Sequence, residues 1–122
     1  MTKNFKREEF ACRCGCGLNM ISPTVVLICQ MIRDTYQQPV VVTSGCRCNE
    51  HNTKIGGAGN SQHTPKGDGY THAVDIKVKN IDPKEVYDYL DEVFPNSLGL
   101  GLYSSWIHID DRMDKKYRWN NR

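Results

Sequence analysis

The sequence lacks a long apolar run. Its first stretch, MTKNFKREEFACRCGCG, has no apolar core of the kind that a secretory signal needs, and nowhere does the chain reach the roughly 20 apolar residues of a membrane-spanning helix. We therefore expect a protein that is made in the cytoplasm and has no membrane partner. Internal repeats, low-complexity tracts and linker-like boundaries are also missing. At 122 residues the chain suits one domain with a core, so we expect a single domain over residues 1–122.

An excess of charge of one sign is missing as well. The 16 lysines and arginines nearly balance the 14 acidic residues, which leaves a formal net charge of +2. Charges this scattered do not favour a nucleic acid partner. The segment RMDKKYRWNNR is basic and aromatic but too short to bind nucleic acid by itself. We expect residues 113–122 to be a basic tail. Because charge does not indicate a partner, the partners of this protein must be inferred from its candidate binding site.

Pairs of cysteines separated by two residues, the usual spacing of zinc knuckles, are absent from a chain that has 6 cysteines. Most of the thiols lie in two short stretches, with Cys12, Cys14 and Cys16 in the first and Cys46 and Cys48 in the second. The first stretch belongs to an irregular lead-in, residues 1–18. A structural metal site, a disulfide between the stretches and free thiols all stay open. Cys29 is expected to be a small buried hydrophobe on a helix.

Two segments carry strong helix signals. Ser22 and Pro23 are typical of a helix start, and the apolar residues that follow at helical spacing predict a helix over residues 23–36. Asp82 and Pro83 give the same start signal for a helix that reaches residue 94. A short helix is expected over residues 48–55, because glycines follow it.

The remaining regular segments read as strands. PVVVTSG and HAVDIKV are short runs rich in β-branched residues, and SLGLGLYSSWIHID reads as two strands joined by a tight turn near Ser104 and Ser105. Few helices and several sequentially paired strands predict an α+β fold, in which a mostly antiparallel central sheet is flanked by helices.

Strand alternation brings three candidate metal ligands to one face of this sheet. Asp75 lies on the strand face opposite Val74 and Ile76, His108 lies in the strand WIHID, and His63 ends a glycine-rich segment. Two imidazoles and one carboxylate leave a fourth zinc position for water, which is the arrangement of a catalytic site. On the residues alone, solvated histidines and a surface carboxylate are the alternative.

These residues resemble the zinc D-Ala-D-Ala carboxypeptidase family, the M15 peptidases of the hedgehog/DD-peptidase fold. The family pattern Ser-x-His-x-x-Gly-x-Ala-x-Asp, with a distant histidine in a Trp-x-His or His-x-Asp setting, is matched by Ser61, His63, Ala73, Asp75, His108 and Asp110. TSGCRCNEHNTKIGGAGNSQH is similar to another family segment, with Arg47 at its arginine. The similarity extends over about residues 5–112, and it implies one catalytic Zn²⁺ held by His63, Asp75 and His108.

The chain departs from the family between its first two ligands. His63 and Asp75 are 12 positions apart, which is longer than the usual family spacing, and Thr71 replaces the motif glycine. We expect an inserted polar loop that bulges outward while the two ligands keep their positions. The insertion also introduces His72, which is either a loop or substrate contact or a surface histidine.

The resemblance implies further roles. Relatives use a carboxylate near the last ligand as general base, but its usual position here is Ser105, so Asp110 becomes the candidate catalytic residue. Its alternative role is to orient a ligand histidine. Arg47 is implied as the ligand of a substrate carboxylate, and Ser61 as a second substrate contact or a turn hydroxyl. Tyr103 and Trp106 flank the last ligand strand and are expected in the cleft or in the core.

The expected function is that of a zinc metallopeptidase. The resemblance implies hydrolysis of amide bonds in bacterial peptidoglycan stem peptides, by a D-Ala-D-Ala carboxypeptidase or an endopeptidase that acts as a monomer. A chain without a signal peptide or wall-binding repeat suits a phage-type lysin, which reaches the cell wall after release. The alternative is a non-catalytic zinc-binding module of hedgehog-like fold.

Overall fold

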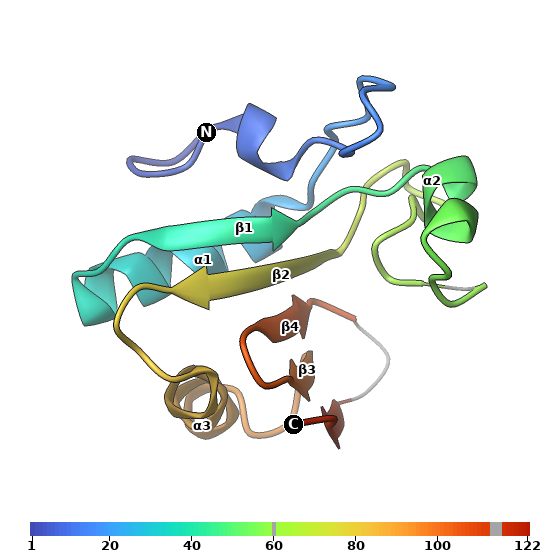
Figure 1. The fold of residues 1–122 in the computed structure, drawn as a ribbon. Coiled ribbons are helices and arrows are strands. Elements are labelled where there is room, and N and C mark those ends of the chain that lie inside the picture. Colours follow the sequence, from blue (N-terminus) through green and yellow to red (C-terminus); the bar gives the residue numbers. More distant parts are fainter. Residues whose placement is uncertain (60, 113–115) are drawn as a thin grey trace.

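The computed structural model describes residues 1–59, 61–112 and 116–122 (Figure 1). Its helices are the 3₁₀ helix η1 (Arg7–Phe10), α1 (Pro23–Tyr36), α2 (Asn49–Lys54) and α3 (Pro83–Val93). Its strands are β1 (Val40–Ser44), β2 (Ala73–Val78), β3 (Gly99–Leu102), β4 (Ile107–Asp110) and β5 (Tyr117–Asn120). Within these described ranges, no helix combines the length and apolar character needed to cross a membrane.

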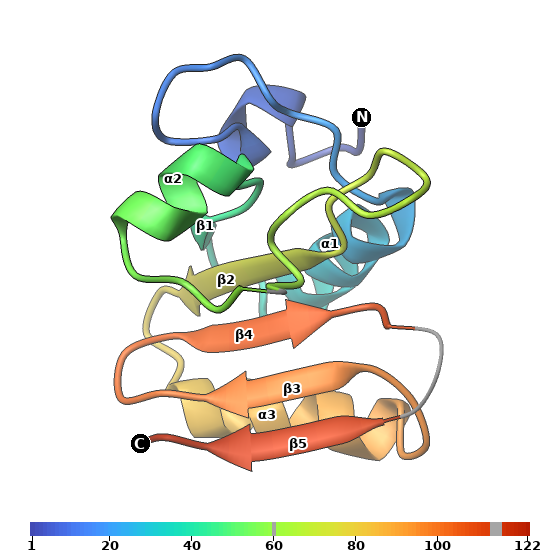
Figure 2. The ribbon, with the colours of Figure 1, turned by 90° about the vertical axis from the view of Figure 1, so that its right-hand side faces the viewer.

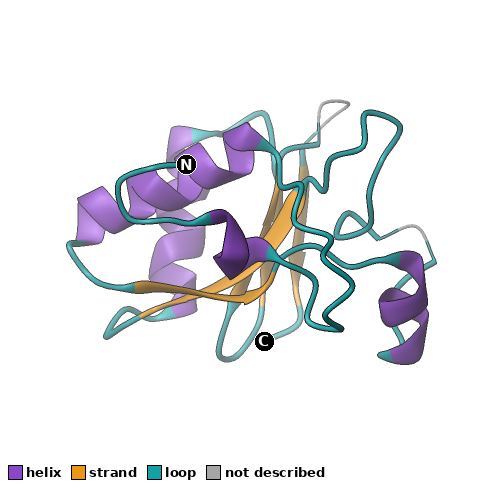
Figure 3. Ribbon diagram, turned by 90° about the horizontal axis from the view of Figure 1, so that it is seen from above, coloured by secondary structure: helices purple, strands orange, loops and turns teal. Residues whose placement is uncertain are grey.

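The strands form one sheet in the order β1-β2-β4-β3-β5. Neighbouring strands are antiparallel except for β3 and β5, which run parallel. The long helices α1 and α3 lie behind this sheet in Figure 2. Seen from above in Figure 3, the long helices stay on one side of the strands, while loops and α2 lie on the other. The predicted α+β fold is confirmed.

Local sequence signals explain the helices. Pro23 occupies the first turn of α1, and the side chain of Asp82 caps α3 by accepting a hydrogen bond of 2.9 Å from the backbone N–H of Lys84. Ser22 precedes α1 as predicted but makes no side-chain cap. Its hydroxyl instead donates to Asp111 over 2.6 Å, which ties the start of α1 to the residue that follows β4.

The helix-covered face of the sheet forms the core. Val74 and Ile76 of β2 and Ile107 and Ile109 of β4 are almost fully buried among apolar side chains of α1 and α3. Because successive strand residues point to opposite faces, the residues between them project away from the helices. That second face therefore receives the polar side chains of the same two strands.

Two segments are more ordered than predicted. The expected basic tail contains the strand β5, although residues 113–115 of that tail lie outside the described residues. The lead-in contains η1, and its Phe5 and Phe10 are buried against each other with ring centroids 5.9 Å apart. The carbonyl oxygen of Phe10 accepts from the backbone N–H of Cys46 over 2.8 Å, which joins the lead-in to the loop after β1.

Candidate metal centre and cleft

One row of residues crosses the sheet and positions the site. The strand register places Asp75 of β2 opposite His108 of β4, His108 opposite Gly101 of β3, and Gly101 opposite Trp119 of β5. Directly opposite residues on neighbouring strands project from the same face. The side chains of Asp75 and His108 therefore lie side by side on the face away from α1 and α3.

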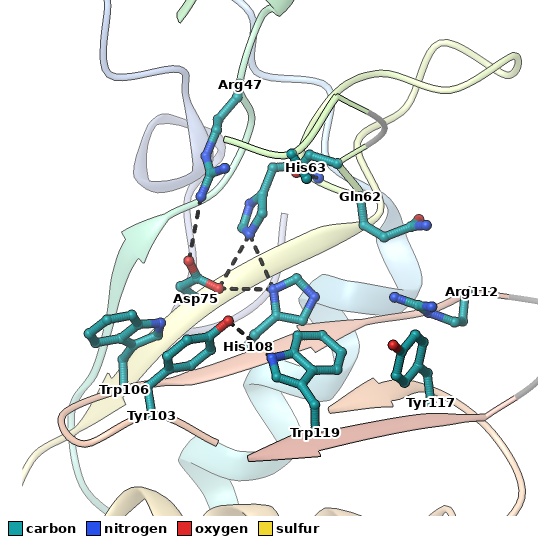
Figure 4. A pocket seen from close by; sticks show the side chains of 12 residues that line it. Arg47, Gln62, His63, Asp75, Tyr103, Trp106, His108, Arg112, Tyr117 and Trp119 are labelled. Atoms are coloured by element: carbon teal, nitrogen blue, oxygen red, sulfur yellow. Dashed lines mark hydrogen bonds and ion pairs between the residues drawn. The ribbon is translucent and has the colours of Figure 1, made fainter. Parts of the chain in front are cut away.

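His63 reaches this row from the loop before β2, and Figure 4 shows His63, Asp75 and His108 pointing toward one another. Nε2 of His63 lies 3.3 Å from both Oδ1 of Asp75 and Nδ1 of His108, and the last two atoms are 3.1 Å apart. Around a tetrahedral zinc ion with bonds of about 2.0–2.1 Å, neighbouring ligand atoms are about 3.3–3.4 Å apart. The three atoms thus have nearly the spacing of three zinc ligands.

The outer nitrogens of both histidines are held by hydrogen bonds. Nδ1 of His63 donates to the carbonyl oxygen of Gly45 over 2.8 Å, and Nε2 of His108 donates to Oδ2 of Asp110 over 2.8 Å. In the neutral imidazoles, these bonds place the protons on the outer nitrogens and leave the lone pairs on the nitrogens that face Asp75. The donor set and its surroundings therefore fit a divalent metal ion.

Asp110 lies on the far side of His108 from the other ligand atoms. Its side chain is fully buried, Oδ1 accepts from Nε of Arg112 over 2.7 Å, and Oδ2 accepts from Nη2 of Arg112 over 2.8 Å as well as from His108. The Arg112 guanidinium in turn lies 4.9 Å from the centroid of the Tyr117 ring. This placement favours the orienting role of Asp110 over the predicted role of general base.

The charges of the cluster stabilise one another. Burial raises the pKa of Asp75, but hydrogen bonds from His108 and His63 outweigh it and hold that pKa well below its usual range. Burial likewise opposes ionisation of Asp110, whereas Arg112 and His108 lower its pKa strongly. Burial lowers the pKa of His108, but the flanking carboxylates of Asp110 and Asp75 raise it above its usual value. A metal ion at this site must therefore compete with protons.

Two glycines of β3 make room for the site. A Cβ atom at Gly99 would overlap the Asp110 carboxylate, and one at Gly101 would overlap the Trp119 ring. Glycine inside a strand often marks such a close approach. With Gly101 in place, the Trp119 ring lies 4.9 Å from the His108 ring, measured between centroids.

A cleft of about 530 Å³ opens over the cluster. Tyr103 and Trp106 stack with ring centroids 4.5 Å apart and line this cleft, and Nε1 of Trp119 donates to the Tyr103 hydroxyl over 3.0 Å. Arg112, Tyr117 and Trp119 also line it, and none of the three was predicted from the sequence. Tyr117 and Trp119 alternate with polar residues, and this alternation could have predicted a strand whose aromatic face lines the cleft.

Arg47 lies in the cleft wall beside the cluster, as Figure 4 shows. Its Nη2 is 3.7 Å from Oδ2 of Asp75, Nε donates to Ser44 over 3.3 Å, and Nη1 donates to Oδ1 of Asn52 over 3.1 Å. Ser61 also lines the cleft, and its hydroxyl accepts from the backbone N–H of His63 over 3.1 Å. That contact stabilises the turn before His63, and the substrate contact of Ser61 stays a prediction.

The inserted loop folds back onto the start of α1. Nδ1 of His72 lies 2.8 Å from Oδ1 of Asp111, and Nε2 lies 2.8 Å from Oδ2 of Asp68. The backbone N–H of the buried Thr71 donates to the Met20 carbonyl over 2.8 Å. His72 therefore holds the loop in place and lies outside the ligand cluster.

Comparison with protein-family models gives a match over most of the chain. The sequence model of the Peptidase M15 family matches residues 3–110 of the chain. No curated protein and no solved structure matches the chain significantly. The matched residues include His63, Asp75 and His108, whereas Arg112, Tyr117 and Trp119 of the cleft lie beyond the match.

Gly99→Ala is expected to disturb the metal centre through Asp110. The new methyl group would displace a carboxylate that Arg112 and His108 hold rigidly, which should lower the free energy of unfolding by about 1–3 kcal/mol. Thermal unfolding and zinc titration measure both effects. Gly67→Ala is the matched control, because its Cβ would meet no atom within 4 Å. Equal zinc affinity in both variants would contradict the role assigned to Gly99.

The His72 contacts should make stability depend on pH. Burial lowers the pKa of His72, but Asp68 and Asp111 outweigh it and raise that pKa. The contacts therefore stabilise the fold fully below the unfolded histidine pKa of about 6.5, and this stabilisation is lost as pH rises through the folded value.

Urea unfolding of the native protein and His72→Gln tests this dependence. The difference in unfolding free energy between the two proteins should be larger at about pH 5.5 than at about pH 8.5. His51→Gln on α2 serves as the matched control. A difference that grows with pH would mean that folding favours the neutral form of His72 instead of the charged form.

Proposed function

Because the chain belongs to the peptidase M15 family, whose members are metal-dependent peptidases, we propose that it is a zinc peptidase with His63, Asp75 and His108 as metal ligands. The observation that carries this proposal is the triangle of ligand atoms, with sides of 3.1–3.3 Å, together with the fixed outer nitrogens of both histidines. When bound there, zinc supplies Lewis-acid activation of water and of the substrate carbonyl.

The proposed substrate is a peptidoglycan stem peptide. Such a peptide is extended and carries free carboxylates, and the cleft over the cluster combines aromatic walls with the guanidinium groups of Arg47 and Arg112. Aromatic faces suit an extended backbone, and guanidinium groups suit carboxylates. We propose that the protein acts on the cell wall as a monomer, in the manner of a phage-type lysin.

Arg47 is proposed to hold a carboxylate of the substrate. Ser44 and Asn52 position its guanidinium, and Nη2 lies 3.7 Å from Oδ2 of Asp75 in the cleft wall. A guanidinium fork can bind a planar carboxylate through two parallel hydrogen bonds, which would fix the register of the scissile bond. Ser44 and Asn52 hold the Arg47 guanidinium beside the three metal ligands, where a bound carboxylate would set the position of the scissile bond.

Asp110 is proposed as a positioning residue in place of the general base that was predicted. Its carboxylate contacts the outer nitrogen of His108 and is closed off from solvent. By accepting that hydrogen bond, Asp110 orients the imidazole and increases the basicity of Nδ1. Among the described residues that line the cleft, Asp75 is the one with a carboxylate group. That carboxylate already contacts His63, His108 and Arg47, so it is not free to act as a general base.

This lining also favours a second candidate function, zinc-dependent peptide binding without hydrolysis. A protein of that kind would need the metal, Arg47 and the aromatic walls, but no carboxylate free to accept a proton. The two functions differ in whether a bound stem peptide is cleaved.

Incubation of the zinc-loaded protein with stem-peptide fragments, followed by mass spectrometry, tests the proposal. We expect two products whose masses add up to the substrate plus one water molecule. Asp75→Asn should abolish cleavage because it removes one of the three ligands. A protein that keeps its zinc and binds the peptide without cleaving it would establish the second candidate function.

The role of Arg47 has its own controls in that assay. A substrate in which the recognised carboxylate is converted to an amide should show a higher KM with the native protein. With Arg47→Lys, the acid and its amide should differ much less, since an ammonium group cannot reproduce the fork. An unchanged preference for the acid in Arg47→Lys would assign carboxylate binding to another residue.

Asp110→Asn separates the two roles considered for this residue. A positioning role predicts zinc affinity lowered by about 10–100-fold and kcat at saturating zinc within about tenfold of the native value. A general base predicts unchanged affinity and a loss of about 10²–10⁴-fold in kcat at saturating zinc. Asp111→Asn is the control, because Asp111 is a neighbouring buried carboxylate that contacts Ser22 and His72.

A further inference from the structure

A second group of metal-ligand side chains lies outside the cleft. Cys12, Cys14 and Cys16 of the lead-in and Cys48 at the start of α2 place their sulfur atoms within 4.8 Å of one another. The Sγ–Sγ distances are 3.4 Å for Cys12 and Cys14, 3.7 Å for Cys14 and Cys48, and 3.9 Å for Cys12 and Cys48. Segments separated by more than thirty residues thus bring their thiols to one point.

These distances fit metal coordination. A disulfide requires sulfur atoms about 2.0 Å apart, and the cysteines are all free thiols. Around a tetrahedral zinc ion with Zn–S bonds of about 2.3 Å, neighbouring sulfur atoms are about 3.8 Å apart. The three separations among Cys12, Cys14 and Cys48, from 3.4 to 3.9 Å, lie close to this value, and the sulfur of Cys16 lies within 4.8 Å of the other three.

The lead-in backbone is shaped to bring three closely spaced thiols to this point. Gly15 and Gly17 have φ values of 82° and 89°, in the left-handed region that glycine adopts without strain. The backbone N–H of Gly15 donates to the Cys12 carbonyl over 3.2 Å, and the N–H of Cys12 donates to the Leu18 carbonyl over 2.8 Å. The backbone therefore turns tightly between residues 12 and 18. Because of this turn, cysteines separated by one residue can reach a common point without the two-residue spacing of zinc knuckles.

Backbone N–H groups also point at the sulfur atoms. The N–H of Cys48 donates to Sγ of Cys12 over 3.5 Å, and the N–H of His51 donates to Sγ of Cys48 over 3.3 Å. Hydrogen bonds to the ionised form favour a thiolate, which is the form that binds a metal. Cys46 and Cys29 are buried elsewhere and do not belong to the group.

We propose that Cys12, Cys14, Cys16 and Cys48 bind a structural zinc ion as four thiolates. Four sulfur ligands leave no open position for water, so the site stabilises the fold and performs no chemistry. The sequence left metal, disulfide and free thiols open for these cysteines, and the sulfur geometry selects the metal.

This zinc ion would fix the loop that supports the cleft. The loop between β1 and α2 carries Gly45, whose carbonyl accepts from His63, and Arg47, whose backbone N–H donates to the His63 carbonyl over 2.8 Å. Cys48 follows Arg47 directly, so a metal bond at Cys48 would hold this loop against the lead-in. The proposal does not depend on the peptidase activity, because the two ligand sets share no residue.

Metal analysis of the purified full chain tests the site. We expect two zinc ions per chain in the native protein and one in Cys14→Ser and in Cys16→Ser. His63→Ala should keep the thiolate-bound zinc, and X-ray absorption of that variant should show sulfur ligands at about 2.3 Å. Cys29→Ala, at a buried thiol outside the group, is the matched control and should keep both ions.

The exposed positions of Cys14 and Cys16 keep this test independent of folding defects. Without a metal, serine at either position should leave thermal stability unchanged, whereas loss of a structural zinc should lower the melting temperature. Zinc bound only through nitrogen and oxygen, a mass two hydrogens lower from a disulfide, or the visible absorption of thiolate-bound iron would each overturn the proposal. Peptide cleavage by Cys14→Ser is measured separately, so failure of either proposal is recognised without the other.

Discussion

The pairing of Asp75 with His108 across β2 and β4 is the constraint on which the rest of the molecule depends. A shift of β2 by one residue in that register would turn Asp75 toward the helices, away from His108, and would expose apolar side chains such as Val74 in its place. The core and the metal centre are therefore opposite faces of one strand alignment, and the burial that stabilises the sheet also specifies where the ligands lie. The same row continues through Gly101 to Trp119, so one alignment positions two ligands and part of the cleft wall.

The site concentrates charge that would be costly to bury without partners. His108 lies between the carboxylates of Asp75 and Asp110. Asp110 makes a bidentate contact with the Arg112 guanidinium, and the Arg47 guanidinium lies beside Asp75. Each ion has a partner of opposite charge, which is the condition under which buried charges are tolerated. A divalent cation among the three ligands would complete this balance, because it takes the place of the proton that the carboxylates otherwise stabilise on His108.

Much of this arrangement follows from local sequence signals, and the remainder depends on contacts between distant segments. The limits of α1 agree with the prediction, because Pro23 and the apolar spacing are local features. The ligand set was proposed from strand alternation and a family resemblance. The sequence could not distinguish a general base from an orienting residue at Asp110, because its burial and its contact with Arg112 appear only in the folded chain. The sequence did not predict Trp119 as a cleft residue because β5 pairs with β3 in parallel. Parallel strands are not joined by a tight turn, so no turn motif in the sequence indicates this pairing.

The edge position of β5 has a consequence for local opening of the sheet. β5 pairs with β3 alone, whereas the ligand strands β2 and β4 each lie between two neighbouring strands. Segments at the edge of a structure open at a lower free energy than its centre, so β5 can separate from β3 while the pairing of Asp75 with His108 stays intact. Such an opening removes the wall that includes Trp119 and leaves the three ligands together, so the fold holds the metal centre more firmly than it holds the shape of the cleft.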